Sequence, residues 1–260
     1  MLPIGSLVRF KRGDHICIFY RSEPFLLQNL VPYLASGLRQ GERCFCVQKP
    51  HLLPLILNGL AALGFDPEHE RRRGALDLHS DEDFYFSSGR FSPRALIDSL
   101  ERSIAEAIAQ GFTGTRTAGE LSCTLHRRHG SPALLCDQVV SYESLVERGF
   151  PGKAVIGICQ YEARLFPPRM LQQVLESHRW AIQETQTGVN RSTLTLRSGE
   201  FMSNIVTDRV YPGEAFHYVV QRRGDPEILS WGRESTIGAA ILSSENVIAE
   251  LSSNRRAGQA

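Results

Sequence analysis

The sequence predicts an α/β fold built on a mainly parallel sheet with helices on both faces. Short, nearly continuous apolar segments alternate with longer segments whose apolar residues have helical spacing, and glycine or proline marks many of the boundaries. Strands that are apolar along their whole length are typical of parallel sheets covered by helices. With 260 residues, the chain can bury a sizeable core without disulfide bonds.

Five strands and five helices are expected in the first part of the chain. The strands are expected at 15–20, 43–48, 75–79, 115–122 and 154–160. The helices are expected at 24–40, 51–64, 93–110, 132–148 and 168–185. The first helix shows the signals that define them: Pro24 suits its first turn, apolar residues recur at helical spacing from Phe25, and Gly41 ends it.

The tail of the chain is expected to form a small second domain. Its elements are a polar linker at 186–200, a β-hairpin of 214–222 and 227–233 around Gly224-Asp225-Pro226, and an amphipathic helix at 235–252. The two domains are expected at 8–185 and 200–252. Because the tail is rich in large apolar residues, we expect it to pack on the first domain or on a second copy of the chain.

The composition argues against several kinds of partner and site. There are 29 basic and 28 acidic residues, so no overall field attracts nucleic acid or an anionic membrane. The first residues lack the apolar core of a signal peptide, and no segment reaches the roughly 18 apolar residues of a membrane span, so we expect a cytoplasmic protein. The six cysteines lack CxxC spacing and mostly lie in apolar runs, which indicates reduced, buried thiols.

The turn after the first strand is not a phosphate loop. It reads Arg21-Ser22-Glu23, without the glycines and lysine of the pattern GxxxxGK[ST], whose backbone amides and lysine hold phosphates. The sequence therefore predicts a protein that binds a ligand without hydrolysing ATP.

A series of short motifs recurs in one order along residues 8–182. They are Gly13-Asp14-His15-Ile16-Cys17 with Tyr20, the turn at 37–43, Gly89-Arg90-Phe91, Arg116 with Gly119-Glu120, Tyr142-Glu143, and Cys159-Gln160-Tyr161. Together they resemble the MEDS domain, the methanogen/methylotroph DcmR sensory domain. The resemblance implies a RecA/KaiC-like sheet without a functional phosphate loop, acting as a cytoplasmic sensor of small hydrocarbon derivatives. It also implies a signalling partner such as a histidine kinase or a transcription regulator.

The candidate ligand-binding residues lie mostly at strand ends. Ligands of open parallel sheets bind beyond the carboxyl ends of the strands, which selects Tyr20, Arg21, Glu120 and Tyr161. His15 and Cys17 complete the set, and their spacing of two places them on one face of the sheet. We expect His15, Tyr20, Glu120 and Tyr161 to border one pocket, although His15 lies at the opposite end of its strand from Tyr20.

Several of these residues also have a structural interpretation. His15 can be a hydrogen-bonded structural histidine, and Cys17 a thiol of the core. Tyr161 can cap the core rather than line a pocket. Glu120 ends an apolar strand and needs a partner, which Arg116, Arg21 or a ligand could supply.

No metal ion and no cofactor are expected. His15, Cys17, Cys44, Cys46 and Cys123 offer possible ligand atoms. In a sheet of order 5-1-4-3-2, with strands numbered along the chain, the strands that carry the first four of these residues are not neighbours.

The preferred interpretation is a non-catalytic sensor module that binds a small, hydrocarbon-derived ligand and relays this to a signalling partner. A second copy of the chain is another candidate partner, whereas direct contact with nucleic acid or a membrane is not expected. One alternative is a degenerate nucleotide-binding regulator, and another is an enzyme that uses Glu120.

Overall fold

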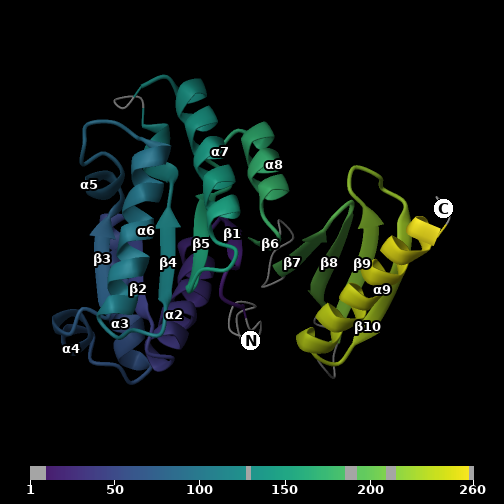
Figure 1. The fold of residues 1–260 in the computed structure, drawn as a ribbon, viewed down its shortest axis with the longest axis horizontal. Helices are drawn as coiled ribbons and strands as arrows, with labels where there is room; N and C mark the ends of the chain where they lie inside the picture. The colour runs from purple at the N-terminus through teal and green to yellow at the C-terminus, as the bar shows by residue number, and fades with distance from the viewer. Residues whose placement is uncertain (1–9, 127–129, 185–191, 209–214, 258–260) are drawn as a thin grey trace. The chain divides into compact units, whose positions relative to one another are not determined.

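The computed structural model describes residues 10–126, 130–184, 192–208 and 215–257. Contacts within the chain divide it into two compact units, of which one comprises Arg9–His178 and the other contains Arg179–Ala260 (Figure 1). The first unit has helices on both faces of its strands, and the described part of the second unit has one helix. None of the described helices is both long and apolar enough to cross a membrane.

The first unit contains the five expected strands, all paired in parallel. They are β1 (His15–Tyr20), β2 (Arg43–Gln48), β3 (Leu76–Ser80), β4 (Thr115–Glu120) and β5 (Val155–Glu162). Their order is β1-β5-β4-β2-β3. The predicted fold class, a mainly parallel sheet with helices on both faces, is confirmed.

The predicted strand order, 5-1-4-3-2, is wrong. β5 lies between β1 and β4, and β2 lies between β4 and β3. Polar residues explain why β3 lies at the border of the sheet. Nε2 of His79 lies 2.9 Å from Oδ1 of Asp77, and both side chains are partly in solvent. Such a strand suits the border of a sheet, whereas Cys44, Cys46 and Val47 of β2 are buried. The expectation that β1 and β2 are not neighbours holds.

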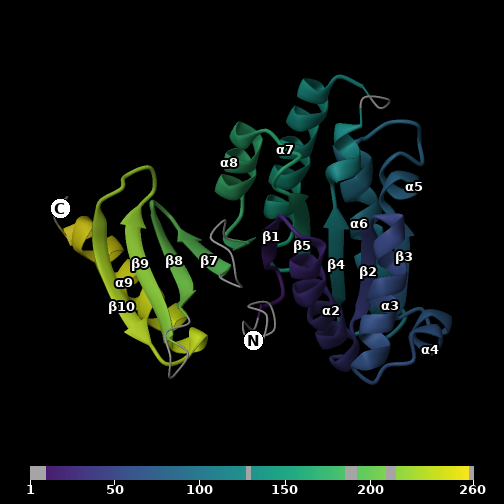
Figure 2. The same ribbon diagram turned by 180° about the vertical axis from the view of Figure 1, so that it is seen from behind.

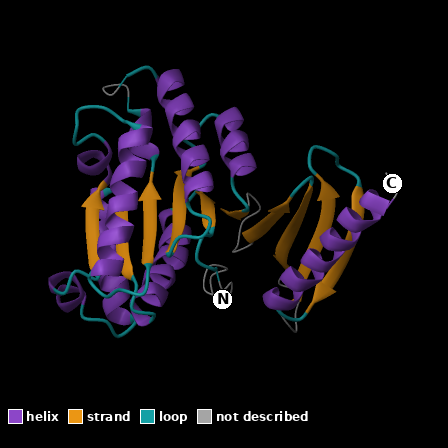
Figure 3. Ribbon diagram, viewed as in Figure 1, coloured by secondary structure: helices purple, strands orange, loops and turns teal. Residues whose placement is uncertain are grey.

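Helices cover the two faces of this sheet. α6 (Pro93–Ala109) and α7 (Pro132–Gly149) lie on one face, and α2 (Glu23–Arg39) and α3 (Leu53–Ala62) lie on the other (Figures 1 and 2). α8 (Pro168–Ser177) packs beside α7. Figure 3 shows the alternation of strand and helix that the sequence predicted. The shorter helical segments are η1 (Pro50–Leu52), α4 (Pro67–Arg72), α5 (Asp81–Tyr85) and η2 (Ser122–Leu125).

The start of α2 occupies the position where a phosphate loop would stand. Ser22 is its N-cap and accepts a hydrogen bond from the backbone N–H of Phe25, 3.4 Å away. Pro24 lies in the first turn. The turn therefore serves to begin a helix, with Ser22 satisfying one of its free amides.

The second unit is an antiparallel sheet with one helix. Its strands are β6 (Trp180–Glu184), β7 (Ser192–Ser198), β8 (Phe201–Asp208), β9 (Ala215–Arg222) and β10 (Ile228–Glu234), paired in sequence order. α9 (Ile237–Ala257) packs on β8, β9 and β10. The expected hairpin and final helix are present.

Three features of this region differ from the sequence-based expectation. The helix expected at 168–185 ends at Ser177, because His178 adopts an extended conformation with ψ of 139°, and β6 follows. Part of the expected linker is β7, in which Leu194 and Leu196 are fully buried, and β8 was not expected. The expected linker residues 186–191 lie outside the described residues.

The apolar residues of the tail are largely covered within the second unit. Phe201, Ile205 and Phe216 are buried in the strands that α9 covers. A hydrogen bond of 2.8 Å between the Oγ atoms of Ser203 and Ser244 joins β8 to α9. Most of this apolar surface therefore needs no outside partner, and docking of the tail on another surface stays a prediction.

Candidate functional site

The first unit contains a cavity of about 250 Å³ between its sheet and helices α6 and α7. Its lining is mainly apolar and aromatic. The lining residues from the strands include His15, Phe45, Val47, Gly119, Gly157 and Cys159. Those from the helices include Tyr85, Leu96, Leu100, Tyr142 and Val146, and Phe150 follows directly after α7. The site therefore lies over a face of the sheet, rather than beyond the strand ends where ligands of such folds are usually found.

Two glycines shape the floor of this cavity. A Cβ atom at Gly157 would lie 2.5 Å from the ring of Phe150 and 2.9 Å from Oγ1 of Thr117. A Cβ atom at Gly119 would collide with the hydroxyl of Tyr85. Because neither strand position carries a side chain, the two aromatic rings can lie against the sheet and form walls of the cavity.

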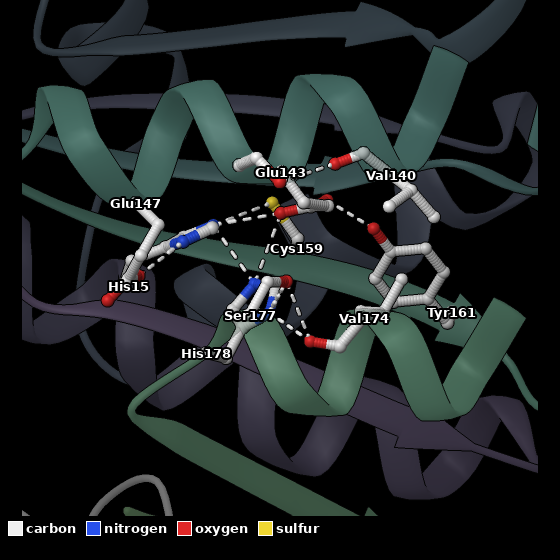
Figure 4. A network of polar contacts seen from close by, with 10 residues as sticks. His15, Val140, Glu143, Glu147, Cys159, Tyr161, Val174, Ser177 and His178 are labelled. Atoms are coloured by element: carbon white, nitrogen blue, oxygen red, sulfur yellow. Dashed lines mark hydrogen bonds and ion pairs between the residues drawn. The ribbon is translucent and has the colours of Figure 1, made fainter. Parts of the chain in front are cut away.

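A polar cluster lies where His15 and Cys159 reach this cavity. Nε2 of His15 is 3.3 Å from Sγ of Cys159 and 3.1 Å from Nε2 of His178. Oε2 of Glu143 lies 3.1 Å from Nε2 of each histidine. Figure 4 shows these four side chains converging from β1, α7, β5 and the residue that follows α8. All four are buried.

The outer atoms of this cluster have partners of their own. Nδ1 of His15 is 3.1 Å from a carboxylate oxygen of Glu147, and Nδ1 of His178 is 2.7 Å from the carbonyl oxygen of Val174. The hydroxyl of Tyr161 donates a hydrogen bond to Oε1 of Glu143 (Figure 4). These contacts fix the orientation of both imidazole rings and of the carboxylate.

Charge complementarity shifts the pKa values within the cluster. Burial favours the neutral form of His15, but the neighbouring carboxylates of Glu143 and Glu147 outweigh it and raise the pKa of His15. Burial and His15 both oppose protonation of His178, yet Cys17 and Glu143 raise the pKa of His178 to about 9. Burial likewise opposes ionisation of Glu143, but the two histidines hold its pKa well below the usual range. The cluster thus favours an ionised carboxylate beside the two imidazole rings.

A second polar cluster lies at the carboxyl ends of the strands. The hydroxyl of Tyr20 donates to Oε1 of Glu120 over 3.0 Å, and the backbone N–H of Ser122 donates to Oε2 over 3.0 Å. Burial raises the pKa of Glu120 to about 7, although Lys49, Ser122 and Tyr20 oppose this. Nearby, Nε2 of Gln48 donates to Oε1 of Gln160 over 2.8 Å.

The structure divides the expected site residues between these two clusters. Tyr20 and Glu120 bond to each other, whereas His15 and Tyr161 meet through Glu143. Gly119 faces the cavity, so its neighbour Glu120 faces the opposite side of the sheet. The prediction that His15, Tyr20, Glu120 and Tyr161 border one pocket is therefore wrong for the described part of the chain.

The remaining expected site residues lie close to these clusters. Cys17 is buried on the same face as His15, as its spacing predicted, and contributes to the raised pKa of His178. Arg21 is half-buried at the end of β1. Ligand binding by Cys17, Tyr20, Arg21, Glu120 and Tyr161 stays a prediction.

The sequence-based reasoning did not assign a site role to Glu143 or His178. A signal was present for Glu143, because it shares one face of α7 with Val139 and Val146 and is fully buried there. A carboxylate on the core face of a helix is uncommon and needs a partner. For His178 the sequence offers no such signal, since it follows the last helix of the unit.

Comparison with known proteins identifies the first unit. Residues 14–179 match the family model described as MEDS, the MEthanogen/methylotroph, DcmR Sensory domain. The chain belongs to the MEDS family. The match ends next to His178, the last residue of the first unit, so the cavity and both polar clusters lie in the MEDS domain.

Two individual proteins are similar to this MEDS chain. The Transcriptional repressor DcmR of Methylorubrum extorquens (strain DSM 6343 / CIP 106787 / DM4) is 25% identical over 172 residues, which are 64% of this chain and 58% of the repressor. The chain thus matches little more than half of that relative. The crystal structure of a KaiC-like protein from Pyrococcus horikoshii OT3 has a TM-score of 0.48 and 10% identity, covering 82% of this chain and 91% of that one.

Proposed function

We propose that this chain is a non-catalytic sensory regulator whose MEDS domain binds a small, largely apolar molecule in the cavity between the sheet and helices α6 and α7. The observation that carries the proposal is the cavity itself, with a volume of about 250 Å³ and a mainly apolar, aromatic lining. Membership of a sensory family and similarity to a transcriptional repressor support the regulatory role.

The size of the cavity limits the ligand. A cavity of about 150 Å³ lined by apolar side chains is enough to hold benzene, and pockets for drug-sized ligands start at about 300 Å³. A ligand of about ten non-hydrogen atoms or fewer therefore fits here. The imidazole of His15 and the thiol of Cys159 offer polar contacts to one end of such a molecule.

The cavity is a better candidate than the strand-end cluster. Tyr20 and Glu120 at the strand ends are hydrogen-bonded to each other, and Glu120 is also satisfied by Ser122. An apolar ligand gains nothing from such groups, whereas it gains free energy from leaving water for an apolar lining. Of the six residues first expected to bind the ligand, His15 is the one in the cavity lining.

The relay step follows from the walls of the cavity. A ligand shifts a conformational equilibrium only when it binds two states differently. Side chains of both α6 and α7 line the cavity, so a ligand that fits one spacing of these helices better than another would favour that arrangement. We propose that a transcription regulator or a histidine kinase responds to this change.

Filling the cavity is expected to abolish binding of small apolar probes. Ser103 lies on α6 in the lining, and its replacement by Phe would occupy the space. Binding of benzene and of 1-butanol to the wild-type chain is measured by NMR chemical-shift changes. The control is Ser36→Phe, on α2 at the opposite face of the sheet. Equal binding by wild type and Ser103→Phe, with Ser36→Phe also unchanged, would place the probes outside the cavity and contradict the proposal.

A further inference from the structure

Four potential metal ligands converge at the end of the cavity. They are Nε2 of His15, Nε2 of His178, a carboxylate oxygen of Glu143 and Sγ of Cys159, and all lie within 4.8 Å of one another. Each side chain is buried. They come from β1, α7, β5 and the residue that follows α8, and His15 and His178 are 163 residues apart.

The partners of the Nδ1 atoms leave both Nε2 atoms available for a ligand role. The carbonyl oxygen of Val174 only accepts hydrogen bonds, so Nδ1 of His178 must carry a proton to bond with it. The carboxylate oxygen of Glu147 accepts in the same way, so Nδ1 of His15 is the donor. Once a metal ion displaces the remaining proton from each ring, both Nε2 atoms present lone pairs, and these atoms are only 3.1 Å apart.

Glu143 presents a further unsatisfied atom at the same point. Its Oε1 accepts the hydrogen bond of Tyr161, but its Oε2 is buried and receives no hydrogen bond from any described residue. Oε2 nevertheless lies 3.1 Å from each Nε2 atom. A buried carboxylate oxygen without a donor costs free energy unless a cation or a proton lies beside it.

We propose that His15, Glu143, Cys159 and His178 form a binding site for a divalent first-row metal ion, with zinc as the best match. Two imidazoles, one carboxylate and one thiolate make a four-donor set of the kind that zinc takes. Tetrahedral zinc places its ligand atoms roughly 3.3–3.8 Å apart. The closest contacts here are 3.1–3.3 Å and all donor atoms lie within 4.8 Å, so small side-chain shifts would complete the tetrahedron. A carboxylate and a thiolate also balance the charge of the ion, so the buried centre is neutral.

The surroundings have the features of a metal centre. Ligating histidines usually donate their other N–H to a carboxylate or a backbone carbonyl. Here Nδ1 of His15 lies beside the carboxylate of Glu147, and Nδ1 of His178 lies beside the carbonyl oxygen of Val174 (Figure 4). Tyr161 orients Glu143 in the same way. His15 and Cys159 also line the cavity, which gives an ion a route to the site.

This ligand set differs from the one considered from the sequence. That set combined His15 with cysteines of several strands, and only His15 belongs to both. The proposal does not depend on what the cavity binds, because the four donors are complete without an organic ligand.

Cobalt(II) tests the proposal in the full-length chain, because it replaces zinc and absorbs light. After removal of metal with a chelator, we expect the wild-type chain to take up one Co²⁺ per chain, with the visible absorption of a tetrahedral ion and a near-ultraviolet thiolate-to-cobalt band. Zinc should displace cobalt and remove both signals. Cys159→Ala should lose the near-ultraviolet band, and His178→Ala should bind Co²⁺ at least about 100-fold more weakly.

Cys46→Ala is the matched control, since it removes a buried thiol from β2 outside the cluster. It should keep both signals. A wild-type chain that shows no thiolate-to-cobalt band overturns the proposal, and this measurement needs no variant to fold. A Cys159→Ala variant with an unchanged band also overturns it. In either case the two histidines and Glu143 would share protons instead of a metal ion.

Discussion

Replacing Arg116 by Met is expected to lower the free energy of unfolding by about 3–5 kcal/mol. Nε of Arg116 lies 2.6 Å from Oε2 of Glu42, and the two side chains are only 5% and 4% exposed. The guanidinium also donates to the carbonyl oxygen of Tyr33 over 3.3 Å and lies 4.8 Å from its ring. The substitution would leave the carboxylate of Glu42 buried without a counter-charge, and this unpaired charge is what lowers the free energy of unfolding. Urea denaturation measures the effect.

A double variant separates the charge effect from lost packing. Arg116→Met combined with Glu42→Leu removes both charges, so we expect it to recover most of the lost stability. Arg71→Met is the exposed control: its ion pair with Glu68 has side chains 48% and 64% exposed, and its loss should cost less than about 1 kcal/mol. A double variant no more stable than Arg116→Met would show that the buried pair is not the cause.

The second large effect is a pH dependence of stability that comes from Glu120. Burial raises the pKa of Glu120 from its ordinary value of 4.5 to about 7. Between these values the unfolded chain releases a proton that the folded chain keeps. The free energy of unfolding therefore falls as the pH rises through this window, by at most about 3 kcal/mol, and stays at the lower value above it.

Glu120→Gln should remove this slope, since an amide has no proton to release in this range. The measurement is urea denaturation at several pH values from 4.5 to 6.5, below the range in which the raised pKa values of His15 and His178 add a slope of their own. Glu162→Gln is the matched control. Burial favours the neutral form of Glu162, but Lys49 outweighs this and lowers the pKa of Glu162, so the carboxylate stays ionised across the range. Its replacement should leave the slope unchanged. A slope that persists in Glu120→Gln would assign the pH dependence to other groups.

Local sequence patterns predicted most elements of the first unit. β1 and β2 begin and end at the expected residues, because Gly13 and Gly41 precede the strands and apolar runs define them. The strand order was not predictable in this way: polar residues suit β3 to the border, but local patterns do not decide which of the other strands pair with each other. β7 was missed although Thr193, Leu194, Thr195 and Leu196 alternate with the period of a strand.

The site was less accessible to sequence-based reasoning than the fold. The period of a strand places His15 and Cys17 on one face, and this was predicted correctly. The rotation of α7 about its axis decides that Glu143 points at His15, and the end of α8 decides where His178 lies. The cavity depends on two strand glycines and the rings packed over them, a tertiary effect with no local signal.

The link between His15 and His178 also constrains how the MEDS domain is made. β1 is synthesised early, but its parallel partner β5 and the ring of His178 come from the far end of the unit. During synthesis, β1 therefore lacks its parallel partner β5 until nearly the whole domain has been translated. Before β5 is made, the described element that can cover β1 is α2, which follows it directly in the sequence and packs on it in the folded domain.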